Sequence, residues 1–173
     1  MASEIRGSDN FDSGKAVLQA VSVLTTAQGT QALTANTEVV VTGLTIDVVP
    51  RGANSKFLIQ ARQFGECTAS WNNIYNILQD GTRVNIGGSA LSYAGLSMAT
   101  QTYGVAADDS DTPEILSLST LVSTSSAVGT TITFALAITT NVSKTLYLNR
   151  CVSAPAAGRE VGSSEIIVTE IGA

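Results

Sequence analysis

The hydrophobic pattern is most regular in residues 131–139. Ile132, Phe134, Leu136 and Ile138 occupy every second position, and threonine or alanine fills the positions between them. Because successive side chains of a β-strand point to opposite faces of a sheet, this period of two predicts a strand with large residues on its core face. The small residues on its second face would let another layer approach closely.

The last apolar run of the chain, residues 166–171, has a different pattern. Three apolar residues are consecutive in it, which suits a strand covered on both faces better than a half-solvated one. The run ends two residues before the C-terminus, and chain ends usually fray unless they are held. We therefore expect the fold to insert this strand between other strands or against another subunit. Six apolar side chains are assigned to the core or to a subunit interface: Phe134, Leu136, Ile166, Ile167, Val168 and Ile171.

The remaining β-type runs are short and are separated by turn-forming residues. Gly43 interrupts one of them and predicts a bulge or bend. Residues 28–30 and 50–54 are turn-like, and Asp80–Gly81 predicts a tight hairpin turn. About eight to ten short strands at this spacing, with no long amphipathic helix, predict an all-β sandwich. The runs cover residues 16–24, 37–49, 56–64, 73–78, 83–86, 114–123 and 144–149.

Residues 1–15 differ from the rest of the chain because they are mostly polar and turn-forming. Such a segment cannot bury enough apolar surface to fold alone, so a binding partner is the most direct way to order it. We expect Ile5, Arg6 and Phe11 to anchor this N-terminal arm. The predicted organisation is therefore the arm, residues 1–15, followed by one β-sandwich domain, residues 16–173.

Charge and hydropathy restrict the possible partners. Only 13% of the 173 residues are charged, 44% are hydrophobic, the mean hydropathy is +0.24 and the net charge is −5. The basic residues are scattered, so there is no basic stripe for nucleic acid. No run approaches the roughly 18 apolar residues of a membrane-spanning helix, so no membrane partner is expected. The low charge suggests that subunit contacts bury much of the exterior. The first residues contain no apolar leader, so we expect synthesis and assembly in the cytoplasm.

The residue types that carry most catalytic chemistry are missing. The chain has no histidine, which removes the Ser-His-acid and Cys-His arrangements and most zinc sites. We therefore expect no enzymatic activity and no cofactor. Asp108, Asp109 and Asp111 form an acidic cluster that could hold Ca²⁺, but the spacing does not fit an EF-hand and a solvated loop is the preferred interpretation. Cys67 and Cys151 are expected to be buried free thiols, although a disulfide between them is left open.

One further pattern is the order of seven short segments along the chain: Lys15–Val21, Val41–Pro50, Ser55–Ile59, Leu78–Thr82, Thr145–Arg150, Gly158–Arg159 and Ser164–Ile171. In this order and spacing they resemble a family of tailed-bacteriophage virion proteins with a trimeric, TNF/C1q-like jelly-roll head. The resemblance covers about residues 15–173, and Glu170–Ile171 retains the ending of the family's final strand. It implies a jelly-roll β-sandwich, a homotrimer, no catalytic residues and a place on the virion.

Members of this family occur at the tips of tail fibres and as separate proteins of the head. Here no coiled-coil heptad, collagen repeat or long shaft precedes the sandwich. We therefore expect a capsid decoration, or cement, trimer that sits over junctions between capsomers and binds the major capsid protein through residues 1–15. The alternative is a tail-fibre or receptor-binding head that contacts a host surface glycan. A secreted C1q-like ligand is disfavoured because the sequence lacks a leader.

Overall fold

A computed structural model describes residues 16–69, 72–85, 97–98, 113–125, 127–153 and 160–173. This part of the chain is all-β, with eleven strands and no helix. The strands are β1 (Val17–Thr25), β2 (Gly29–Leu33), β3 (Glu38–Val48), β4 (Lys56–Cys67), β5 (Asn73–Gln79), β6 (Thr82–Arg83), β7 (Ser97–Met98), β8 (Glu114–Ser123), β9 (Ile132–Thr140), β10 (Lys144–Leu148) and β11 (Ser164–Ile171).

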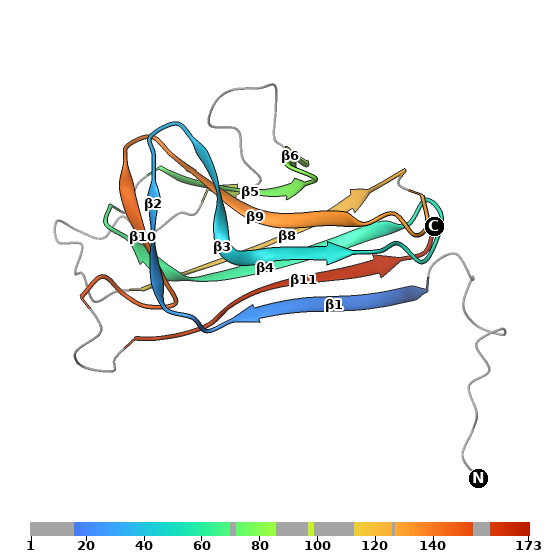
Figure 1. The fold of residues 1–173 in the computed structure, drawn as a ribbon, viewed down its shortest axis with the longest axis horizontal. Helices are drawn as coiled ribbons and strands as arrows, with labels where there is room; N and C mark the ends of the chain where they lie inside the picture. The colour runs from blue at the N-terminus through green and yellow to red at the C-terminus, as the bar shows by residue number, and fades with distance from the viewer. Residues whose placement is uncertain (1–15, 70–71, 86–96, 99–112, 126, 154–159) are drawn as a thin grey trace, which may run out of the picture.

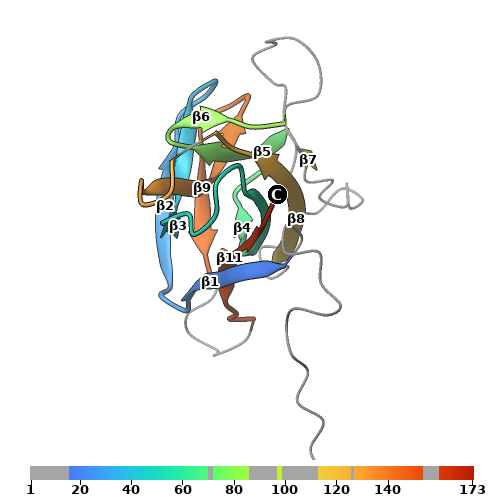
Figure 2. The same cartoon turned by 90° about the vertical axis from the view of Figure 1, so that its right-hand side faces the viewer.

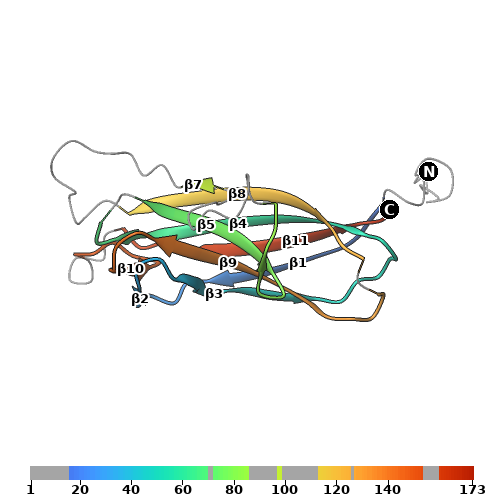
Figure 3. The same cartoon turned by 90° about the horizontal axis from the view of Figure 1, so that it is seen from above.

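The strands form two sheets (Figures 1 and 2). In the first sheet, β4 pairs with β11 and then β10 along one edge and with β8 along the other. Strand β1 extends this sheet beyond β11, and β2 extends it beyond β10. The second sheet has the order β3-β9-β5-β6, and β7 also pairs with β5. The paired strands are antiparallel. Strands β1, β11, β4 and β8 run along the long axis of the molecule, whereas β2 and β10 run across it (Figures 1 and 3).

The inner faces of the two sheets enclose one hydrophobic core. Phe57 of β4 and Phe134 of β9 meet across it with their ring centroids 5.6 Å apart, and both side chains are fully buried. Around them, the inward aliphatic residues of β3, β5 and β11 complete the same cluster. Burial of this apolar surface is the main favourable term for such a domain.

The last strand lies inside the first sheet, between β1 and β4, as the sequence predicted. The pairing continues past the last apolar residue, because the backbone N–H of Gly172 donates a hydrogen bond of 2.9 Å to the carbonyl oxygen of Ala16. An inserted strand has both of its backbone edges satisfied. This is how the end of the chain is prevented from fraying.

Two local predictions about backbone geometry are also confirmed. The β3–β9 pairing shifts register between Val40 and Thr45, on either side of Gly43. In the β5–β6 hairpin, Asp80 and Gly81 both have positive φ angles, 49° and 78°. These angles belong to the tight turn that matches the twist of two antiparallel strands.

Other parts of the fold differ from the prediction. Residues 28–30 are not a simple turn, because Gly29 begins β2, which pairs with β10 throughout its length. The composition of β2 gives little local β signal, so its extended conformation depends on this partner. Strand β4 continues beyond the predicted end at Phe64 to Cys67, and β6 is shorter than the predicted run.

A close approach between β4 and β10 requires glycine at position 65. A Cβ atom built on Gly65 would collide with the carbonyl oxygen of Tyr147 and would lie 2.5 Å from Nε2 of Gln63. The Tyr147 oxygen belongs to the backbone of β10, whose residue Leu148 is the register partner of Gly65. It cannot withdraw without disturbing that pairing.

We therefore expect Gly65→Ala to lower the free energy of unfolding by about 3 kcal/mol, because overpacking here displaces backbone rather than a flexible side chain. Urea titration followed by circular dichroism measures this. Gly29→Ala is the matched control, since the nearest atom to its added Cβ, Cδ1 of Leu148, is 4.0 Å away. Equal unfolding midpoints for the two variants would contradict the steric argument.

Candidate functional site

The candidate functional surface is the outward face of the first sheet, formed by β1, β11, β4 and β8. Along β11 the side chains alternate in burial: Ile166 and Val168 are buried, whereas Ile167 and Ile171 are half-buried on the outer side. Ile167 lies beside Gln60 of β4 in the register of the sheet. The strand therefore presents one apolar row to the core and a second row outward.

Apolar side chains continue on this face on both sides of β11. Val17 and Leu24 of β1 are 63% and 59% exposed, and Ile115 and Leu121 of β8 are 63% and 48% exposed. Half-buried Leu58 of β4 is the register partner of Leu121. Large aliphatic side chains gathered on one exposed sheet face are typical of an interaction surface. We call this surface the outer apolar face; it comprises Val17, Leu24, Leu58, Ile115, Leu121, Ile167 and Ile171.

An open hollow of about 390 Å³ lies on this face. Arg62 and Glu165, which are register partners of opposite charge, line it together with Gln60, Ser117 and Ser119. The two serines of β8 are short, whereas the residues of β4 beside them are long, so the surface is recessed along β8. The charged and hydroxyl groups of this hollow can form hydrogen bonds with a partner, and protein interfaces contain such bonds beside their apolar contacts.

One expectation for the last strand is not met within a single chain. The consecutive apolar residues 166–168 were expected to be covered on both sides, but Ile167 and Ile171 retain partial exposure. The described elements cover only the inner side of β11, where the second sheet packs. The outward apolar residues of the strand are therefore not covered by any element in the described part of the chain.

The same strand carries a buried carboxylate near its end. Glu170 is fully buried, and its oxygens accept hydrogen bonds from the backbone N–H groups of Arg51 (2.9 and 3.0 Å) and Gly52 (2.9 Å). They also accept hydrogen bonds from Ser55 Oγ (2.7 Å) and Gln19 Nε2 (2.6 Å). The carboxylate thus joins β1 and β11 to the turn between β3 and β4.

Burial by itself raises the pKa of Glu170, but the hydrogen bonds from Ser55, Gly52, Arg51 and Gln19 outweigh it and lower the pKa below its usual value. These donors stabilise the charged form. Because the folded pKa lies below the unfolded one, the stabilisation is fully present above the unfolded pKa. It is lost as the pH falls through the folded pKa.

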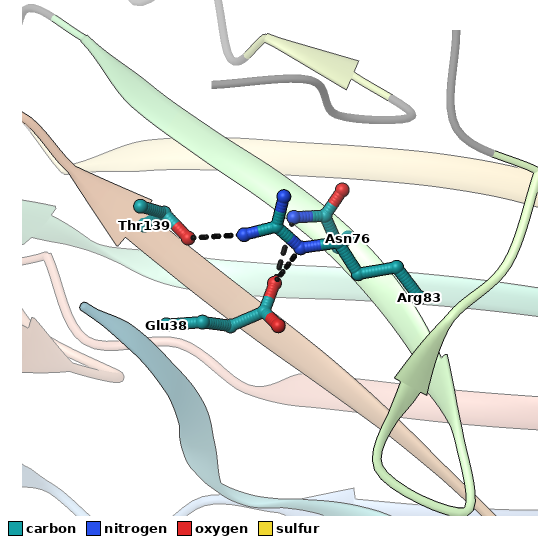
Figure 4. A network of polar contacts seen from close by, with 4 residues as sticks. All are labelled: Glu38, Asn76, Arg83 and Thr139. Carbon is teal, nitrogen blue, oxygen red and sulfur yellow. Dashed lines mark hydrogen bonds and ion pairs between the residues drawn. The ribbon is translucent and has the colours of Figure 1, made fainter. Parts of the chain in front are cut away.

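A second polar cluster lies on the outward face of the second sheet (Figure 4). Arg83 Nε of β6 donates to Glu38 Oε1 of β3 at 2.7 Å, and Asn76 Nδ2 of β5 donates to the same oxygen at 2.8 Å. The Arg83 guanidinium also reaches Thr139 Oγ1 of β9 at 3.4 Å. The cluster therefore links four of the five strands of this sheet, β3, β9, β5 and β6. The Arg83–Glu38 pair is partly exposed and screened by water, so its contribution to stability is modest.

The sequence-predicted residues fall into three groups. Four lie fully buried in the core: Phe134, Leu136, Ile166 and Val168. Two lie on the outer apolar face: Ile167 and Ile171. The proposed anchors and acidic cluster lie outside the described residues: Ile5, Arg6, Phe11, Asp108, Asp109 and Asp111. Cys67 and Cys151 are buried and are not joined by a disulfide. Within the described ranges, no group of cysteine or acidic residues is arranged to hold a metal ion.

The buried polar residues that sequence reasoning missed include Glu170, Lys144 and Asn73. A signal was present for the first two, because the period of two places Glu170 on the same face as Ile166, and Lys144 on the same face as Leu146. Charged residues in such positions are rarely fully buried. The alternation of each strand therefore indicates that its charged residue faces inward.

Comparison with protein-family models gives no match, and comparison with curated proteins gives none either. In the part of the chain that the structure describes, there is no helix long and apolar enough to cross a membrane.

Glu170→Gln should destabilise the fold by about 3 kcal/mol near neutral pH. The glutamine amide is uncharged, and its NH2 group would face N–H and O–H donors that the carboxylate oxygens now accept from. The free energy of unfolding of the variant and of the wild type should converge as the pH is lowered from about 7 to about 3, since only the wild type loses its carboxylate there. Urea titrations across this pH range measure both effects.

Glu165→Gln is the control for this measurement, because Glu165 lies on the same strand but on the outer side. It should leave the unfolding free energy nearly unchanged at both ends of the pH range. A constant difference between wild type and Glu170→Gln at every pH would show that the loss is not due to the carboxylate charge.

Proposed function

We propose that this protein is a non-enzymatic structural subunit of a tailed-phage virion, a homotrimeric jelly roll that decorates and stabilises the capsid. The observation that carries the proposal is the outer apolar face, which gives the subunit a surface suited to burial against other subunits. The placement on a phage particle rests on the segments that resemble the family of trimeric virion proteins. The absence of histidine from the sequence agrees with a structural role.

The strand order supports a jelly-roll topology. The chain moves from β3 in the second sheet to β4 in the first and back to β5 in the second. It then moves from β8 in the first sheet to β9 in the second, and the first and last strands are neighbours. Repeated crossing between two antiparallel sheets is the connectivity of a double Greek key.

Second copies of this chain are the proposed occupants of the outer apolar face. Three features favour self-association over a different protein partner. The chain has few charges overall, the face combines aliphatic residues with one register pair of opposite charge, and the resemblance is to a family of trimers. Repeated copies would bury Ile167 and Ile171, which a single chain leaves half-exposed.

The major capsid protein is the proposed partner of the N-terminal arm. The arm joins the sandwich at Ala16, immediately before β1, which is one of the strands of the outer apolar face. Its polar composition suits a segment that becomes ordered on a partner surface. On this proposal Ile5, Arg6 and Phe11 fasten the trimer to the shell, and many repeated contacts stabilise the head.

Ile167→Asp should leave a folded chain that no longer assembles, because the half-exposed position tolerates a charge in the monomer but not in a buried interface. Light scattering after gel filtration should give a trimer for the wild type and a monomer for the variant, with unchanged circular dichroism. Ile166→Asp is the matched control and should unfold the chain, since its side chain is fully buried. A monomeric wild type, or a trimeric Ile167→Asp, would contradict the proposed interface.

The location on the virion is tested by abundance in purified particles. A capsid decoration protein should approach the major capsid protein in copy number, because its sites repeat over the whole shell. Quantitative gel densitometry measures this ratio. A ratio lower by an order of magnitude or more would favour the alternative of a tail-fibre head and overturn the cement assignment.

Deleting residues 1–15 should keep the trimer but abolish its binding to particles that lack the protein.

A further inference from the structure

A buried lysine and a buried asparagine meet at the end of the sandwich where β4 ends. Lys144 begins β10 in the first sheet and is 7% exposed, and Asn73 begins β5 in the second sheet and is 0% exposed. Lys144 Nζ donates hydrogen bonds to Asn73 Oδ1 at 2.9 Å and to the carbonyl oxygen of Ala69 at 3.0 Å. The contact therefore bridges the two sheets between residues that are 71 positions apart.

The alternation of the strands explains why these side chains face each other. Lys144 shares the inward face of β10 with Leu146, and Asn73 shares the inward face of β5 with Tyr75. Both strands begin at this end, so the two polar residues cap the apolar core. The hydrogen bond from Lys144 Nζ is accepted by the carboxamide oxygen of Asn73, so the oxygen and not the NH2 group faces the lysine.

Burial makes the charged form of Lys144 less favourable than it is in water. Burial lowers the pKa of Lys144, although Cys67 and Glu114 act in the opposite direction. Burial also raises the pKa of Tyr75, with added contributions from Cys67 and Glu114. The carboxyl group of Glu114 acts electrostatically on both side chains. Glu114 begins β8 on the same side of the strand as the buried Leu116 and is the register partner of Gly65, near the end of β4. A neutral lysine amine shielded from water is a nucleophile.

We propose that Lys144 and Asn73 form an intramolecular isopeptide bond that covalently links the two sheets. The Nζ atom of Lys144 forms a bond to Cγ of Asn73, and the Cγ–Nδ2 bond breaks. The proton lost from Nζ is carried, through the carboxyl group of Glu114, to Nδ2, which leaves as ammonia. The reaction needs no oxidant or co-reactant, since an amine and a primary amide become a secondary amide and ammonia.

Two physical arguments favour this reaction over a permanent hydrogen bond. Burial disfavours the charged form of Lys144, and amide formation removes the charge altogether. The fold also holds the amine against the carboxamide before reaction, which replaces an encounter in solution by an oriented contact.

The test is the mass of the intact full-length protein. The wild type should be lighter than its sequence mass by one ammonia, whereas Lys144→Arg should have its full sequence mass in the same preparation. Arginine keeps the positive charge and the donors but not the nucleophilic amine. Because acylated lysine resists trypsin, the digest should contain residues 63–83 joined to residues 84–150 as one branched product.

Specific outcomes would overturn the proposal. Asparagine cyclisation also releases ammonia, so a mass loss that persists in Lys144→Arg would assign the reaction to another site. A wild type with its full sequence mass and with separate peptides would leave only the hydrogen bond. If Lys144→Arg does not fold, the branched peptide of the wild type decides alone. Glu114→Gln should fold and lack the bond; full bond formation in this variant would remove Glu114 from the proton-transfer role. None of these readings depends on trimerisation or on capsid binding.

Discussion

The arrangement of the first sheet depends on how the carboxylate of Glu170 is satisfied. An unpaired buried charge would cost more than a domain of this size could tolerate. Here the turn after β3 directs two consecutive backbone N–H groups at it, and Ser55 and Gln19 complete the set. These donors come from segments that are far apart in sequence. They meet only when β11 lies beside β1, so the charge specifies the position of the last strand as well as stabilising it.

Insertion of β11 also determines what the outer surface can do. A strand paired on both edges cannot shift without breaking two ladders, so Ile167 and Ile171 are held in place before any partner arrives. A preorganised surface loses little conformational freedom on association. The inner row of the same strand, Ile166 and Val168, fills the core. In the proposed trimer, one strand would thus contribute to folding through one face and to assembly through the other.

The sequence was sufficient for the features that depend on local pattern. The alternation in residues 132–138, the Asp80–Gly81 turn and the interruption at Gly43 each act over a few residues, and each is found as predicted. Strand β2 could not be predicted in this way, because its conformation is imposed by β10, more than a hundred residues later. The same reason hid the partners of Glu170. The alternation of residues in this strand indicates that Glu170 faces inward, but it cannot indicate which donors the folded chain brings to the carboxylate.

Glu170 and Lys144, which are buried near opposite ends of β4, show why burial alone does not decide what a polar group does. Glu170, beside the turn that precedes β4, receives converging neutral donors, and its pKa falls, so its charge is retained. Lys144, near the end of β4, faces a carbonyl and an amide oxygen, and its pKa also falls, which for a lysine means that the charge is disfavoured. A shift in the same direction therefore makes the carboxylate more permanent and the amine more reactive. The first group is suited to holding a turn by hydrogen bonds alone. The second is the position in the core where a covalent bond would relieve an unfavourable charge and fasten one sheet to the other.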